Sequence, residues 1–123
     1  MIRFPLSVLV VPSRREDFLK AVRAILEPTR GAPGSVGCRP YQDTENSDVL
    51  MLVGEWTSQS DLDRYLGSDA CKTLIAAMEL SRQPPLIHFN EIAHRAGIEV
   101  IKAARRACGK IQDFPSDATG DRA

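Results

Sequence analysis

The sequence predicts an α+β domain in which strands and helices follow one another in the order β-α-β-β-α-β. Four apolar runs of strand length, rich in β-branched side chains, occur in the first 93 residues. Segments with helical spacing separate the first run from the second and the third run from the fourth. The length of 123 residues is enough for one hydrophobic core but not for two. We therefore expect one folded domain with a C-terminal addition.

The first strand and helix are predicted from residues 3 to 27. Residues 3–11 form an apolar run that ends at Pro12, and both of its faces are mostly apolar, which indicates burial on both sides. Ser13 and Glu16 match a capping box at the start of a helix. The helix then carries one apolar face: Phe18, Ala21, Val22, Ile25 and Leu26. Pro28 disfavours helical geometry at Glu27, and residues 31–34 are loop chemistry, so the helix is expected to end there.

The middle of the chain predicts a hairpin followed by a broken helix. Residues 36–43 and 49–57 are the second and third strands, with a polar turn over 44–48, and the third strand is again apolar on both faces. Ser58 with Asp61 is expected to cap a short helix, and a second helix is expected to open at Ser68 or Asp69. The predicted apolar stripes are Leu62, Tyr65 and Leu66 on the short helix, and Cys71, Leu74, Ile75 and Met78 on the next.

Residues 86–93 complete the pattern as a fourth strand. This order is the split βαβ, or ferredoxin-like, plan: a four-stranded antiparallel sheet with helices on one side. The uncovered face would be too apolar for water, so we expect two copies to pack sheet against sheet as a homodimer. The predicted organisation is a ferredoxin-like domain over residues 1–96, a helical extension over 97–110 and a flexible polar tail over 111–123.

The helical extension carries an apolar stripe opposite basic residues. Ile98, Ile101, Ala104 and Cys108 form the stripe, and Lys102, Arg105 and Arg106 lie opposite. Such a helix can dock on a membrane or a partner, or pack on its own domain or its dimer mate. We favour packing because the helix is short and has few large apolar residues.

Composition excludes several classes of function. Sixteen basic and sixteen acidic residues cancel, which argues against a protein that binds nucleic acid through phosphates. No apolar run is long enough to span a bilayer, and the N-terminus lacks a signal-peptide core, so no membrane association and a cytoplasmic location are expected. Three widely spaced cysteines, Cys38, Cys71 and Cys108, predict reduced thiols rather than disulfides or a zinc site.

Candidate functional residues are few. Trp56, the only tryptophan, ends a strand beside the helix that carries Tyr65, and this corner either lines a pocket or packs as core. Tyr41 has the same two interpretations. His88 is a candidate base or anchor, and Asn90 would share its strand face; the alternative for His88 is a hydrogen-bonded interface residue. Two histidines six residues apart are a poor metal signature, so no metal is expected.

Over about residues 3 to 93, the chain resembles the antibiotic biosynthesis monooxygenase family of the dimeric α/β-barrel superfamily. The resemblance is carried by these segments: residues 8–11 before the first helix, Gly34 to Tyr41, Glu55-Trp56-Thr57-Ser58 followed by Asp61-Leu62 and Tyr65-Leu66-Gly67-Ser68, and residues 86–91. It implies a homodimer with a pocket between sheet and helices in each subunit.

The activity that the resemblance implies is oxidation of a quinol-like or polycyclic aromatic substrate by dioxygen, without metal, flavin or other cofactor. Trp56 matches the pocket-lining tryptophan of known oxygenases, and Tyr65 falls where haem-degrading relatives carry an aromatic residue. The expected catalytic residues are Trp56, Tyr65 and His88. The expected substrate contacts are Tyr41, Leu52, Leu74, Met78 and Asn90.

Two departures argue against haem degradation. Ile75 takes the place of the histidine that binds iron in haem-degrading relatives, and Ser7 takes the place of their polar first-strand residue. The sequence also lacks a clear acid–base pair. An alternative function is therefore a non-catalytic dimeric domain that binds a small apolar ligand or a protein partner.

Overall fold

The computed structural model describes residues 1–110, and these fall into two units that are described separately. The first unit comprises Met1–Ile92, and the second begins at Ala93. The predicted tail, residues 111–123, lies outside the described residues. In the first unit the elements are β1 (Ile2–Leu9), α1 (Pro12–Arg30), β2 (Ser35–Gln42), β3 (Val49–Trp56), α2 (Gln59–Leu66), α3 (Asp69–Met78), β4 (Leu86–Ile87) and β5 (Asn90–Glu91).

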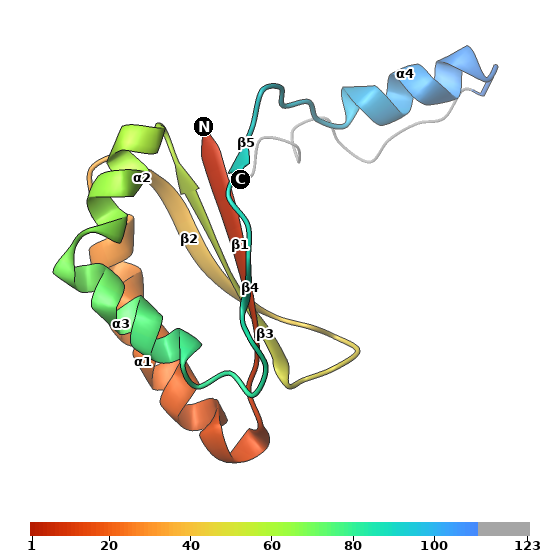
Figure 1. The fold of residues 1–123 in the computed structure, drawn as a ribbon. Helices are drawn as coiled ribbons and strands as arrows, with labels where there is room; N and C mark the ends of the chain where they lie inside the picture. The colour runs from red at the N-terminus through yellow and green to blue at the C-terminus, as the bar shows by residue number, and fades with distance from the viewer. Residues whose placement is uncertain (111–123) are drawn as a thin grey trace. The chain divides into compact units, whose positions relative to one another are not determined.

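The sheet has the order β2-β3-β1-β4, with β5 also paired to β1, and its pairings are antiparallel. This is the ferredoxin-like topology, so the predicted α+β fold class is confirmed. The helices α1, α2 and α3 all lie on one side of the sheet (Figure 1). The sheet path ends at β2 and at β4, so the sheet of a single chain does not close into a barrel.

The strand register defines two faces. Leu6 lies beside Leu52 and Ile87 on the face under the helices, which we call the helix face. The next row, on the opposite or open face, contains four residues aligned across the sheet: Tyr41, Met51, Ser7 and Leu86. Because side chains alternate along a strand, this open face carries every second residue of β1 and β3.

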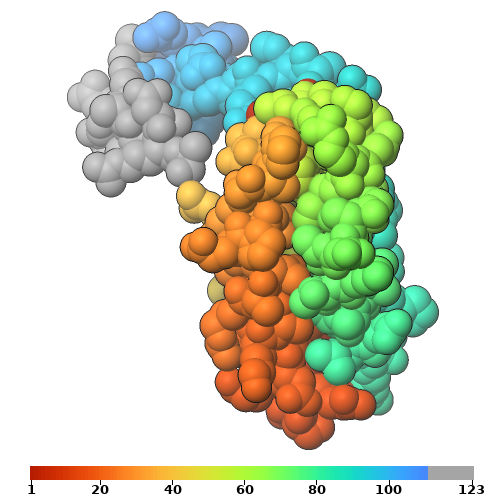
Figure 2. Space-filling model, turned by 90° about the vertical axis from the view of Figure 1, so that its left-hand side faces the viewer, coloured from red at the N-terminus to blue at the C-terminus, as the bar shows by residue number. Residues whose placement is uncertain are grey.

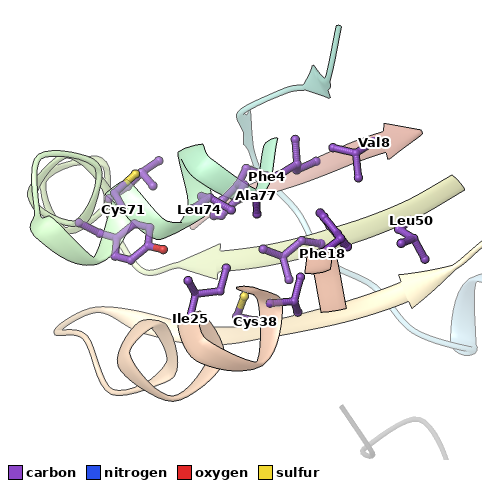
Figure 3. Close-up of a cluster of buried hydrophobic side chains, with 14 of the residues drawn as sticks. Phe4, Val8, Phe18, Ile25, Cys38, Leu50, Cys71, Leu74 and Ala77 are labelled. Carbon is purple, nitrogen blue, oxygen red and sulfur yellow. The ribbon is translucent and has the colours of Figure 1, made fainter. Parts of the chain in front are cut away.

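The core lies between the helix face and the helices. Phe18, Val22 and Ile25 of α1 are buried against it, which confirms the predicted apolar face of that helix. Figure 3 shows Cys38 of β2 and Leu74 of α3 pointing into the same cluster. Figure 2 shows α1 and α3 side by side across this side of the molecule.

The predicted start of α1 was wrong, whereas its end before Gly31 agrees with the predicted loop. The helix begins at Pro12 with Val11 as N-cap, and no side-chain cap is formed, so Ser13 and Glu16 do not make a capping box. Proline is well suited to the first helical position because its fixed φ is helical and it needs no partner for an N–H. The helix also continues through Pro28 to Arg30. A proline this close to the C-terminus removes only one backbone bond, and the burial of Thr29 holds the last turn in place.

The predicted fourth strand is interrupted. β4 pairs with β1 at Leu6 and Ser7, and β5 pairs at Ile2 and Arg3, so the gap lies opposite Phe4 and Pro5. Pro5 has no N–H to offer to the ladder, which explains the break. The chain crosses the gap with Phe89, whose ring lies 5.7 Å from that of Phe4, centroid to centroid.

The broken second helix is confirmed as α2 and α3, with two corrections to its apolar stripes. Leu66, predicted in the stripe of α2, is 36% exposed. Cys71, Leu74 and Ala77 are the buried residues of α3, and Met78 is partly buried. Ile75, predicted in the stripe, is 50% exposed. Ala77 takes the inner position because α3 packs directly on α1, and a small side chain allows the two helices to approach closely.

The second unit contains the predicted extension as α4 (Glu99–Ala107). Within that helix Val100 and Ile101 are about half exposed and no residue is buried. Among the described residues, no helix has both the length and the apolar character needed to cross a bilayer.

Candidate functional site

Trp56 lies at the end of β3, on the helix face, and is completely buried. Its register partners are Ile2 on β1 and Ser35 on β2. The indole Nε1 and the hydroxyl of Ser35 are both buried and have no hydrogen-bond partner among the described residues. The two residues are paired across β3 and β2 where the register shifts between Ser35 and Gly37. A buried donor without an acceptor costs about 1–3 kcal/mol, so the burial of Trp56 carries an energetic cost that its apolar contacts must offset.

Tyr65, on α2, joins Trp56 in one contact. The two ring centroids are 4.9 Å apart and the ring planes are inclined by 33°. The Tyr65 hydroxyl shares a hydrogen bond of 2.9 Å with Thr29 Oγ1, near the end of α1. The strand-to-helix aromatic corner expected from the sequence is therefore a real contact, anchored to α1 by a buried hydrogen bond.

Titration of the groups around this corner is suppressed by burial. Burial raises the pKa of Tyr65, the bond from Thr29 opposes the rise, and the nearby Cys71 and Cys38 add to it. Burial likewise raises the pKa of Cys71, and it raises that of Cys38 to about 11 against an opposing effect of Arg30. The phenol and the thiols are thus neutral at physiological pH. They can offer hydrogen bonds but no negative charge.

A pocket of about 220 Å³ reaches this corner from the solvent side, and we call it the Tyr65 pocket. It lies between the end of α1, the loop over residues 31–34 and the α2–α3 junction. Its lining is mostly apolar except for two charged residues at its edge: Pro28, Ala32, Pro33, Asp61, Arg64, Tyr65, Ser68 and Ala70. Pro28, Pro33 and Arg64 are exposed, so the pocket opens to solvent. Tyr65 is the residue that connects it to buried Trp56.

Asp61 and Arg64 supply the charge at the pocket. Asp61 Oδ2 accepts hydrogen bonds from Ser58 Oγ at 2.9 Å and Thr57 Oγ1 at 3.0 Å, and Arg64 Nη1 lies 3.4 Å from Asp61 Oδ1. The bonds from Ser58 and then Thr57, followed by the charge of Arg64, lower the pKa of Asp61. Asp61 is therefore an ionised acceptor. Gly34 permits this arrangement, because its φ of 85° and its close approach to Asp61 leave no room for a side chain.

The structure divides the remaining predicted site residues between the two faces. Leu52 and Leu74 are buried on the helix side together with Trp56, and Met78 is partly buried there. Tyr41 is 51% exposed in the open-face row beside Met51. Asn90 lies opposite Arg3 in β5, and both Asn90 and His88 are exposed. Tyr41, His88 and Asn90 are thus separated from the Trp56–Tyr65 contact by the sheet, and their roles stay predictions.

Three residues of the site were missed as functional candidates. Thr29 follows Val22 and Ile25 at helical spacing, a signal that was hidden because Pro28 was taken to end the helix. Asp61 was recognised only as a capping partner. Arg64 is one turn beyond Asp61 on α2, and this spacing of three residues could have indicated the ion pair.

The described residues contain no cluster of three or more histidine, cysteine, aspartate or glutamate side chains that could hold a metal ion. The Tyr65 pocket offers a carboxylate, a guanidinium and a phenol around an apolar wall. That set can bind and orient a small organic molecule with hydroxyl groups.

Comparison with known proteins agrees with this fold. The sequence profile of the family described as antibiotic biosynthesis monooxygenase matches residues 4–77. Among curated proteins, an uncharacterised protein of Synechocystis is 24% identical over 59 residues, which cover 48% of this chain and 40% of that protein. The match therefore spans less than half the length of that relative.

Solved structures share the same architecture. A conserved protein from Methanosarcina mazei superposes with a TM-score of 0.70 at 24% identity, over 73% of this chain and 90% of its own. The protein Rv0793 of Mycobacterium tuberculosis gives 0.70 at 20% identity, over 77% and 97%. A crystal structure of an antibiotic biosynthesis monooxygenase gives 0.69 at 16% identity, over 76% and 100%. At these identities the likeness concerns the fold.

The sheet, the helix layer and the aromatic corner thus define a ferredoxin-like α+β protein with a small pocket beside its helices. With the profile matching more than half of its length, the chain belongs to the antibiotic biosynthesis monooxygenase family.

Proposed function

We propose that this protein is a cofactor-independent monooxygenase that oxidises a single-ring quinol with dioxygen in the Tyr65 pocket. The observation that carries the proposal is the position of Tyr65, a residue that lines the pocket and whose ring contacts the buried Trp56. The volume of about 220 Å³ supports a single ring, since a cavity of about 150 Å³ accommodates benzene. A polycyclic substrate would need a larger pocket.

The proposed chemistry needs only the substrate and dioxygen. One oxygen atom replaces a ring hydrogen of the hydroquinone and the other leaves as water, so the product is a hydroxyquinone and the substrate supplies all four electrons. The reaction begins with transfer of a hydroxyl proton from the quinol to solvent water at the mouth of the pocket, where Pro28, Pro33 and Arg64 are exposed. Arg64 stabilises the resulting anion electrostatically, Asp61 accepts a hydrogen bond from the second hydroxyl, and neutral Tyr65 orients the ring.

Oxygen uptake with a panel of monocyclic hydroquinones tests the proposal, with labelled dioxygen to follow the inserted atom. We expect label in the hydroxyquinone. Arg64→Gln should lower kcat/KM by roughly tenfold or more, as expected for the loss of one interaction with the reacting anion. Tyr65→Ala should also lower it, because it removes the ring that orients the substrate.

Arg23→Gln is the matched control, because Arg23 is also an exposed helical arginine paired with a carboxylate, Glu16 at 3.2 Å. It should leave turnover unchanged. Uptake no faster than autoxidation for every hydroquinone, or equal losses in the Arg64 and Arg23 variants, would refute the enzyme assignment.

A second candidate function is ligand binding without turnover. Trp56 and Leu62 are completely buried and Leu74 nearly so, so these side chains already occupy the space between sheet and helices. Trp56 is the only tryptophan, and its fluorescence reports on ligands in the adjoining pocket. Saturable quenching by a hydroquinone with no oxygen uptake would favour this function.

We also propose that two copies associate through their open faces. The row of Tyr41, Met51, Ser7 and Leu86 crosses all four strands, and three of its four members are apolar or aromatic. Leu86 is 64% exposed in the single chain. Burying this row against the same row of a second copy would remove it from water.

A further inference from the structure

Two neighbouring cavities lie along β2, the strand at one end of the sheet. The first measures about 220 Å³, and its wall includes Phe18 and Leu19 of α1. The second measures about 690 Å³ and is lined by Arg30 of α1 and by residues 36–41 of β2. Both cavities are lined by Pro40 and Tyr41, so they meet at this part of the strand, and we call them together the edge groove.

The edge groove is separate from the Tyr65 pocket, with which it shares no lining residue. Pro28 lines the Tyr65 pocket and Arg30 lines the groove. Two residues of an α-helix are about 200° apart around its axis, so these two side chains leave α1 on nearly opposite sides. The two sites are therefore independent.

The guanidinium of Arg30 is held at the wall of the groove. Its Nε donates a hydrogen bond of 3.0 Å to the carbonyl oxygen of Cys38, a residue of β2 that lines the same cavity. In the part of the chain that the structure describes, this is the one hydrogen bond of the Arg30 side chain, which is exposed. Because Nε is used by the strand, an anion in the groove meets the two Nη groups, each of which carries two N–H donors.

The charge of the groove is uneven along its length. The cavity at Arg30 has Arg39 as a second arginine and no carboxylate among its lining residues. The first cavity is mostly apolar, and its one charged residue, Arg15, is paired with Asp48 at 2.6 Å. One end of the groove thus suits an anion and the other end suits an apolar group.

The distance between these ends sets the length of a ligand that fills both. Cys38, which fixes Arg30, is three residues from Tyr41, where the apolar cavity begins. At about 3.3 Å per residue this part of the strand is about 10 Å long. A ligand therefore needs a chain of several carbon atoms between its charged group and the wall formed by Phe18 and Leu19.

We propose that the edge groove binds an amphipathic anion, which has a carboxylate or phosphate head group and an unbranched apolar chain. The head group accepts hydrogen bonds from the two Nη groups of Arg30, a pairing that a guanidinium makes with two oxygen atoms at once. The chain follows β2 past Pro40 and ends against Phe18 and Leu19. This site does not depend on the proposed oxidation at the Tyr65 pocket.

Octanoate, octyl phosphate, octan-1-ol and acetate are suitable probes. The first two carry both the anion and the chain, octan-1-ol lacks the charge, and acetate lacks the chain. Each is titrated into the full-length protein while the backbone amide and arginine Nε–H NMR signals are followed. We expect octanoate or octyl phosphate to shift the Arg30 Nε–H signal and the amide signals of Cys38 and Leu19, and the tighter of the two identifies the head group.

The better of these two anions should bind about tenfold more tightly than octan-1-ol, the effect of one hydrogen bond to a charged group. It should bind at least about tenfold more tightly than acetate, because acetate buries no methylene groups in the apolar cavity.

Arg30→Gln removes the cation and should abolish the preference over octan-1-ol. Arg23→Gln makes the same change at an exposed arginine about two turns earlier on α1 and should keep the preference. Leu19→Trp fills the apolar cavity while leaving Arg30 intact, and it should lower the affinity for octanoate to that for acetate.

Equal affinity for the two anions and octan-1-ol, or an unchanged preference in Arg30→Gln, would overturn the proposal. So would shifts confined to the Tyr65 pocket or to the open-face row. If Arg30→Gln does not fold, which its spectrum would show, the comparison with octan-1-ol and the Leu19→Trp variant decide.

Discussion

Three residues from three elements meet at the aromatic corner, and only one of their contacts is a hydrogen bond. Thr29 of α1 bonds to Tyr65 of α2, whose ring packs on Trp56 of β3. Thr29 is 1% exposed and is the one buried polar side chain in the described core. Among the described residues its hydroxyl bonds only to Tyr65. Each hydroxyl therefore offsets the desolvation cost of burying the other.

Removing both partners of this bond should cost less than the sum of the two single removals. Thr29→Val and Tyr65→Phe each leave a buried hydroxyl unsatisfied, and each should lower the free energy of unfolding by about 1–3 kcal/mol. The double variant leaves no unpaired group and should be destabilised by less than the sum of the two. Urea unfolding of all four proteins measures the coupling. Strictly additive losses would show that the bond contributes nothing in solution.

At the scale of elements, α2 is a helix of eight residues that depends on its cap. Ser58 is the N-cap, and its Oγ accepts a hydrogen bond of 3.2 Å from the Asp61 amide while donating one to Asp61 Oδ2. A helix this short is marginal by itself, so the cap and the packing of Leu62 and Tyr65 decide whether it forms. Since α2 carries Asp61, Arg64 and Tyr65, the cap also positions the pocket.

Ser58→Ala should destabilise the protein by about 1 kcal/mol, the usual effect of losing an N-cap. The effect should depend on pH. The lowered pKa of Asp61, caused first by Ser58, contributes stability that is present above its unfolded-state pKa and is lost as pH falls through the lower folded value. The difference in free energy of unfolding between wild type and Ser58→Ala should therefore become smaller in acid. Urea unfolding at neutral pH and at a pH below the ordinary pKa of aspartate measures this difference.

Ser13→Ala is the matched control, because Ser13 is an exposed serine in the first turn of α1, where no side-chain cap is formed. Its effect should stay within about 0.5 kcal/mol at every pH. A loss in Ser13→Ala equal to that in Ser58→Ala would show that removing any serine hydroxyl from a first helical turn has this effect, and that the cap is not its cause.

At the scale of the whole molecule, one face of the sheet is packed and the other is open. The helices cover the row of Pro40, Leu52, Leu6 and Ile87, whereas the next row faces away from them (Figure 1). A stable interface between proteins usually buries about 1,200–2,000 Å² in total, and a face of four strands has room for that.

Sedimentation at micromolar concentration should give the mass of two chains. Leu86→Glu places a charge in the open-face row and should shift the equilibrium towards single chains. Ile75→Glu makes the same change at a similarly exposed position on α3, on the helix side, and should leave the dimer intact. If the wild-type protein sediments as a single chain, both the proposed dimer and the role proposed for the open face are wrong.

Much of the fold follows from local pattern. The alternation in β3, the apolar spacing of Phe18, Val22 and Ile25, and the Ser58–Asp61 cap each specify an element from neighbours in the sequence, and the structure confirms each of them. The position of Trp56 beside the helix of Tyr65 was predictable for the same reason, since only two residues separate the end of β3 from the start of α2.

The features decided by tertiary structure all depend on partners distant in the chain. Helix α1 continues beyond Pro28, where Thr29 forms a hydrogen bond with Tyr65, a residue 36 positions away in the sequence. The fourth strand breaks because Pro5, at the other end of the domain, offers no donor to it. The Tyr65 pocket and the edge groove likewise arise where α1 meets residues of β2, β3 and α2. Local propensity specifies elements, but a backbone donor, a buried hydroxyl or a pocket wall is completed only when the elements pack.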